Sequence, residues 1–191
     1  MSEFQVFLQI GIQHIINLEG LDHILFIVVL CAAYSPQDWK KILLLVTAFT
    51  IGHTLSLILA TLDLIPIDKN LIETLIPITI IITALNNLLQ YNKQKIPYFM
   101  AVFFGIIHGL AFAKDLKSLL MFSKENFIIK LLAFNIGIEI GQLAIVVLLL
   151  IIFIIFAKLF QHHQKILKQT ISLTATLVAL YIIIERTNLL S

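Results

Sequence analysis

Residues 127–157 form one long apolar stretch whose only charged side chains are Lys130 and Glu139. A helix of roughly 20 residues crosses the hydrocarbon core of a bilayer, which is about 30 Å thick, so this stretch is long enough to span a membrane. Five more apolar stretches are joined by short polar connections, at residues 20–34, 42–62, 71–90, 97–113 and 170–185. The sequence therefore predicts an all-α, polytopic transmembrane helical bundle of six spans in a single integral membrane domain, residues 1–191.

The composition excludes most other classes of protein. Only 13% of the residues are charged and 60% are hydrophobic, with a mean hydropathy of +1.02. A soluble domain carries about 25% charged residues, so a soluble enzyme, a disordered tail and a nucleic-acid-binding protein are excluded. The single cysteine, Cys31, excludes an internal disulfide framework. The lipid bilayer is the expected partner, and the sequence leaves a homo-oligomer open.

Residues 3–17 are predicted to form a separate short helix before the first span. Asn17-Leu18-Glu19-Gly20 follows, and Asn and Gly disfavour the interior of a helix. In one straight helix His14 and His23 would point in opposite directions, because nine residues at about 100° each place them about 180° apart. A bend near Gly20 would instead fold His14 back toward His23.

The polar connections differ in charge on the two sides of the predicted bundle. Those after the first, third and fifth spans are rich in lysine, whereas the opposite side holds most of the acidic residues. Lys and Arg number seven on the first side and six on the second. The positive-inside rule, which counts Lys and Arg, then predicts that both termini lie outside.

Six ionisable residues lie within or beside the apolar stretches, where a charged group costs at least about 2.5–3.5 kcal/mol to insert. They are His14, Asp22, His23, His53, His108 and Glu139. At 1.5 Å per residue, most of them fall in one slab between the membrane midplane and the acidic side, about 9 to 18 Å from a membrane surface. Scattered histidines would have no reason to share a level, and we therefore expect one composite site.

Imidazole and carboxylate ligands favour a divalent first-row metal ion, such as nickel, cobalt or zinc. All six ionisable residues are candidate metal ligands, and the sequence leaves open whether His14 is one of them. Asn135, Glu139 and Gln142 share one helix face, because they occur at i, i+4 and i+7. We expect Thr50, Asn135 and Gln142 to lie next to the metal ligands and to orient them.

Four motifs carry a resemblance to a known family. They occur in order along almost the whole chain, at residues 11–26, 49–57, 105–113 and 134–142, and include Asp22-His23, Gly52-His53-Thr54, His108-Gly109 and Asn135-Ile136-Gly137-Ile138-Glu139. The sequence resembles the HupE/UreJ family of membrane proteins, which are accessory to hydrogenase and urease systems. The resemblance implies a permease for nickel or cobalt in the bacterial inner (plasma) membrane.

The first motif departs from the permease branch of that family. The branch carries His-Pro, five residues and then Asp-His, whereas here Ile15 follows His14 and seven residues separate His14 from Asp22. The sequence is closer to the second branch of the family, whose substrate is less defined.

Two functions from different classes follow from this pattern. In the first, a permease, a divalent cation enters from the acidic side, where a negative vestibule raises its local concentration; the vestibule residues are Glu19, Asp63, Asp68 and Asp115. In the second, an intramembrane metal-dependent hydrolase, the histidines hold a zinc-type ion that activates water. Glu139 or Asp22 would then be the general base. A metal-stabilised membrane scaffold is a third alternative.

Overall fold

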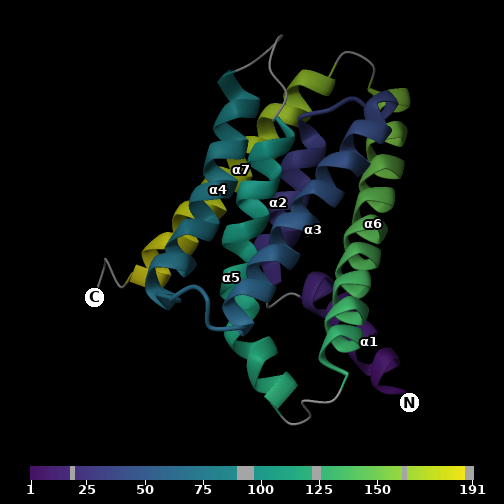
Figure 1. The fold of residues 1–191 in the computed structure, drawn as a ribbon. Coiled ribbons are helices and arrows are strands. Elements are labelled where there is room, and N and C mark those ends of the chain that lie inside the picture. Colours follow the sequence, from purple (N-terminus) through teal and green to yellow (C-terminus); the bar gives the residue numbers. More distant parts are fainter. Residues whose placement is uncertain (18–19, 90–96, 122–125, 161–162, 188–191) are drawn as a thin grey trace.

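The structure, a computed structural model, describes residues 1–17, 20–89, 97–121, 126–160 and 163–187. This part of the chain is a bundle of seven α-helices without a strand, which confirms the predicted all-α fold (Figure 1). The helices are α1 (Glu3–Ile16), α2 (Leu21–Ala32), α3 (Trp39–Thr61), α4 (Lys69–Leu89), α5 (Tyr98–Met121), α6 (Phe127–Leu159) and α7 (Gln164–Thr187), with a short 3-10 helix, η2 (Pro36–Asp38), before α3.

Helices α3 to α7 are each long and apolar enough to cross a membrane. Helix α2 has only 12 residues, about 18 Å, which is shorter than the hydrocarbon core. It meets the same test only together with α1, as a pair bent by 67° at the break between them. The predicted N-terminal helix is thus present as α1, whereas the predicted first span, residues 20–34, is too short to cross by itself and is a sixth span only when α1 and α2 are counted as one.

The N-terminus of α1 is fixed by a capping box. The backbone N–H of Gln5 donates to Ser2 Oγ, and the backbone N–H of Ser2 donates to Gln5 Oε1, over 3.3 and 2.9 Å. These two bonds satisfy donors that a helix N-terminus leaves free. The short helix therefore begins at a defined residue.

Helix α5 is longer than predicted. The sequence suggests an end near residue 113, whereas the helix continues for two more turns to Met121. The added segment is amphipathic: Leu116 and Leu120 are buried one turn apart, and Asp115 and Lys117 are not. Its charged residues therefore ended the apolar stretch without ending the helix.

Glycines bring two pairs of helices into close contact. A Cβ atom on Gly105 would overlap the carbonyl oxygen of Phe49, and one on Gly137 would overlap that of Leu8. The first contact joins α5 to α3 and the second joins α6 to α1. Small residues are the usual means by which helix backbones approach in lipid. The glycines therefore allow α5 to approach α3, and α6 to approach α1, more closely than any larger residue would.

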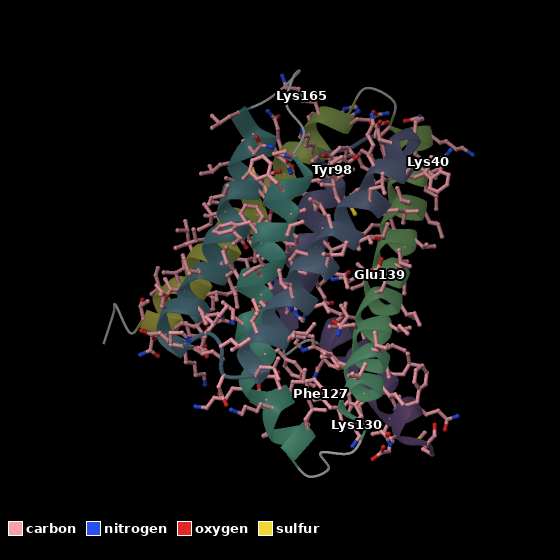
Figure 2. All side chains as sticks on the ribbon, viewed as in Figure 1. Lys40, Tyr98, Phe127, Lys130, Glu139 and Lys165 are labelled. Carbon is pink, nitrogen blue, oxygen red and sulfur yellow. The ribbon has the colours of Figure 1, made fainter. Side chains whose placement is uncertain are left out.

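The bundle has two distinct ends. We call the end at which α3, α5 and α7 begin the lysine-rich end; Lys40 and Lys165 lie there in Figure 2. We call the opposite end, at which α4 and α6 begin, the acidic end; Phe127 and Lys130 lie there in Figure 2. Helix α1 begins and α7 terminates at the acidic end (Figure 1).

Candidate metal centre

Four histidines from four helices meet inside the bundle. The ring centroids of His14 (α1) and His23 (α2) are 4.7 Å apart, and that of His23 is 5.9 Å from His53 (α3) and 5.0 Å from His108 (α5). His53 and His108 are fully buried, His23 is nearly so, and His14 is partly buried. The predicted return of His14 toward His23 is therefore present.

Local backbone contacts hold these histidines in place. The N–H of Gly20 donates to the carbonyl of Asn17 over 3.0 Å, and a Cβ atom on Gly20 would press against the carbonyl oxygen of His14 at 2.8 Å. Gly109, which follows His108, packs directly against the backbone of His53. The glycines beside the histidines thus let their backbones approach.

Three of the histidines have the geometry of a metal site. His14, His23 and His53 each offer a ring nitrogen, and these atoms all lie within 4.8 Å of one another. Around a tetrahedral ion with metal–nitrogen bonds of about 2.0–2.1 Å, ligand atoms are about 3.3 Å apart. Small side-chain movements would bring the three nitrogens to that separation.

The ring nitrogens of the four histidines are short of hydrogen-bond partners. Within the described residues, those that are buried without a hydrogen bond are Nε2 of His14, both nitrogens of His23 and His53, and Nδ1 of His108; of these, His23 Nδ1 lies 3.2 Å from Asp22 Oδ1. A buried polar atom without a partner costs about 1–3 kcal/mol, so native proteins keep few of them. One bound cation would supply a partner to several nitrogens at once. The donor set therefore fits a divalent transition-metal ion.

The tautomer of His108 follows from its neighbour Thr79 on α4. The Thr79 hydroxyl donates its single proton to the carbonyl of Ile76 over 2.7 Å. Its oxygen also lies 3.0 Å from His108 Nε2; in the tautomer that keeps both hydrogen bonds, Nε2 carries the proton and donates it to Thr79. Nδ1 of His108 is then unprotonated, as a metal ligand must be. The sequence analysis missed Thr79, because its partner lies 29 residues away.

Asp22 connects the histidines to α7. Its Oδ1 accepts from the backbone N–H of His23 over 3.0 Å and lies 3.2 Å from His23 Nδ1. Its Oδ2 lies 3.3 Å from Nη2 of Arg186. The sequence analysis missed Arg186 as a site residue, because the pair is separated by 164 residues. The carboxylate is buried and has partners on both oxygens.

A cavity of about 410 Å³ leads to the cluster from the acidic end. Its polar lining includes His14, Asp22, His23, Glu73, Asp115 and Arg186. Asp115 is exposed, whereas Asp22 and His23 are buried at the inner part of the cavity. The cluster is therefore reached from the side that carries most of the acidic residues.

The predicted negative vestibule has a different composition from the one expected. Asp115 lines the cavity, but Asp63 pairs with Lys117 Nζ, 2.5 Å away. Asp68 caps α4, since its Oδ1 accepts from the backbone N–H groups of residues 70 and 71 over 3.0 and 3.2 Å. Glu19 lies outside the described residues. Glu73, which was not predicted, contributes a second acid to the cavity.

Glu139 and the three predicted supporting residues lie between α3 and α6. Three hydroxyl groups of α3 donate to side chains of α6: Thr47 to Glu139 over 2.7 Å, Thr50 to Gln142 over 2.7 Å, and Thr54 to Asn135 over 2.6 Å. We call these six residues the polar ladder. It runs from the level of the histidines toward the lysine-rich end, and Glu139 lies about half-way along α6 in Figure 2.

The structure does not place Glu139 beside the three-histidine cluster. Its partner Thr47 precedes His53 by six residues, about 9 Å along the axis of α3. Oε2 of Glu139 is buried without a hydrogen-bond partner. Glu139 as a metal ligand thus stays a prediction, and so do Thr50, Asn135 and Gln142 as supporting residues.

Three phenylalanines form an aromatic layer on the side of the histidines that faces the lysine-rich end, opposite the cavity. Phe26, Phe49 and Phe104 lie on α2, α3 and α5, each one turn closer to the lysine-rich end than the histidine of its helix. The ring centroid of Phe26 is 4.9 Å from that of Phe49 and 5.9 Å from that of Phe104. All three side chains are buried. This layer separates the histidine cluster from the lysine-rich end.

A buried histidine cluster inside a bundle of membrane-spanning helices defines an integral membrane protein with a candidate intramembrane metal centre. The chain belongs to the HupE/UreJ protein family, whose profile matches residues 1–186 and so covers every residue of the cluster. Comparison with curated proteins and with solved structures gave no match.

Proposed function

We propose that the protein is a membrane permease for a divalent transition-metal cation of the nickel or cobalt class, with His14, His23 and His53 as the binding site. One observation carries the proposal: ring nitrogens from three helices lie within 4.8 Å of one another, and two of these histidines, His14 and His23, line a cavity at the acidic end. The HupE/UreJ family is associated with nickel and cobalt transport, and neutral imidazole is a suitable ligand for both metals.

Charge favours approach of a cation from the acidic end. Asp115 and Glu73 line the cavity, and Asp22 lies at its inner part beside His23. A cleft lined by acidic groups concentrates cations and speeds their association. In this account the cation exchanges its water for imidazole nitrogen at the cluster.

The polar ladder favours a permease over an enzyme. A permease needs polar groups on both sides of its binding site, and the ladder supplies hydroxyl, amide and carboxyl groups between the histidines and the lysine-rich end. Glu139 Oε2, buried and without a partner, is available to a passing cation. Release then requires the aromatic layer to open.

A second candidate is an intramembrane metal-dependent hydrolase. The observation in its favour is that the aromatic layer closes one side of the cluster while the cavity reaches it from the other. A zinc-type ion held by three histidines keeps one position open for water and lowers the pKa of that water to about 7. Asp22, 3.2 Å from His23 Nδ1, would be the general base, because Glu139 does not lie beside the cluster.

Uptake of Co²⁺ or Ni²⁺ into sealed proteoliposomes tests the proposal. The wild-type protein should give saturable uptake, and His53→Ala should abolish it. His163→Ala is the matched control, because His163 is exposed outside the cluster, and it should transport like the wild type. Tightly retained metal in the wild-type protein without any uptake would contradict the permease and favour the hydrolase.

A further inference from the structure

Arg186, the only arginine of the chain, reaches from the last turn of α7 into the metal-site cavity. Its Nη2 lies 3.3 Å from Asp22 Oδ2, and its Nη1 donates to the backbone carbonyl of Glu73 on α4 over 3.0 Å. The guanidinium lines the same cavity as His14 and His23. One cationic side chain thus lies beside the site at which a metal cation is proposed to bind.

The two oxygens of the Asp22 carboxylate have different partners. One carboxylate oxygen faces His23, and the other faces Arg186. The carboxylate is only 7% exposed, and a buried carboxylate requires a cationic partner. A guanidinium keeps its charge in proteins, so Arg186 supplies that partner at all times. A divalent cation held by His23 would lie beside the same carboxylate, because Asp22 Oδ1 is 3.2 Å from His23 Nδ1, and it would compete with the guanidinium for that negative charge.

Resting on the permease function proposed above, we infer that Arg186 is a built-in counter-cation that holds Asp22 when no metal is bound and that an arriving cation must displace. The competition makes metal binding weaker than the histidines and Asp22 alone would allow. It therefore helps the cation to leave during transport. It also favours divalent over monovalent cations, because a single positive charge has no electrostatic advantage over the guanidinium it must displace.

The consequence is an opposite effect on binding and on transport. Without Arg186, Asp22 is free for the metal, so the cation should bind more tightly and leave more slowly. A residue that only holds α7 against α2 and α4 would affect stability and metal binding differently when it is replaced. Its loss would lower stability and weaken the site.

The test is Co²⁺ binding to purified protein by titration calorimetry, combined with Co²⁺ uptake into proteoliposomes. We expect Arg186→Gln to lower the Kd for Co²⁺ at least tenfold and to slow uptake at least fivefold. Arg186→Lys keeps the charge but loses the forked contact to Asp22 and Glu73, and should lower the Kd two- to fivefold. Lys117→Gln removes a positive charge that pairs with Asp63 at the same end, and should change the Kd less than twofold.

An unchanged or higher Kd in folded Arg186→Gln protein would overturn the inference while leaving the permease intact. If Arg186→Gln does not fold, Arg186→Lys decides, and a Kd equal to or above that of the wild type would overturn it. A tightening by Lys117→Gln as large as that by Arg186→Gln would also overturn it, because general charge removal would then suffice. A wild-type protein that binds no Co²⁺ would contradict the proposed function itself.

Discussion

Replacing His53 by alanine should separate metal binding from folding. His53 is fully buried on α3, and both of its ring nitrogens lack a hydrogen-bond partner. Removing the ring leaves a cavity, which costs about 2–5 kcal/mol for a large buried side chain. It also removes two unsatisfied polar atoms, whose burial costs about 1–3 kcal/mol each. The two effects are of similar size and opposite sign, so they should largely cancel in the free energy of unfolding of the metal-free protein.

Metal binding should respond far more strongly to the same change. Loss of a residue that only supports a ligand lowers metal affinity about 10–100-fold. Loss of one of three imidazole ligands should therefore weaken binding at least about 100-fold, which is about 2.8 kcal/mol. Co²⁺ titration calorimetry measures the affinity, and thermal unfolding in the presence of a chelator measures the stability.

Leu57→Ala is the matched control. Leu57 is fully buried one turn after His53 on the same helix, and its truncation should cost about 2–5 kcal/mol of stability. It should leave the Kd for Co²⁺ within threefold of the wild type, because Leu57 has no ligand atom. If His53→Ala behaved like Leu57→Ala, with lower stability and unchanged affinity, His53 would be a packing residue and the assignment would be wrong.

Three further predictions concern acid, helix packing and the aromatic layer. Protonated imidazole cannot bind a metal, so Co²⁺ affinity should be constant at neutral and alkaline pH and should fall once the pH is low enough to protonate the buried histidines; affinity that does not fall at any acidic pH at which the protein stays folded would exclude histidine ligands. Gly137→Leu should push α1 away from α6, where the contact leaves no room for a side chain, and weaken Co²⁺ binding at least tenfold through His14; an unchanged Kd would show that His14 is not a ligand. Phe26→Ala should open the aromatic layer, lower stability by about 3–5 kcal/mol and speed Co²⁺ flux through vesicles; unchanged or slower flux would show that the layer is not the barrier.

Local patterns predicted most of the helices. Apolar stretches, Gly20 and the short polar connections are local features, and each depends only on the residues of one helix or on those beside it. The bent pair α1 and α2 follows from them. The end of α5 could not be predicted from local features, because Leu116 and Leu120 continue the apolar face of the helix while Asp115 and Lys117 lower the mean hydropathy. Hydropathy averages over all faces of a helix, whereas burial depends on one.

Partners across the bundle could not be predicted from the sequence. Lys130 interrupts the longest apolar stretch of the sequence, yet its side chain is buried, with Nζ 3.0 Å from Glu3 Oε1 and 5.8 Å from the ring centroid of Phe7. Arg186 likewise contacts a residue near the other terminus. Depth along each helix predicted which histidines share a level, since the rise per residue is fixed. Which side chains then meet depends on the rotation of each helix, and glycine contacts between distant segments set that rotation.

The most direct test of the account is the coordination of a metal ion bound to the purified protein. We expect one Zn²⁺ per chain, and X-ray absorption should show three imidazole nitrogens at about 2.0–2.1 Å. The His53→Ala protein should lose this signal, and the His163→Ala protein should keep it. A protein that binds no metal, or one whose bound ion has only oxygen neighbours, would contradict the claim that His14, His23 and His53 form a metal centre.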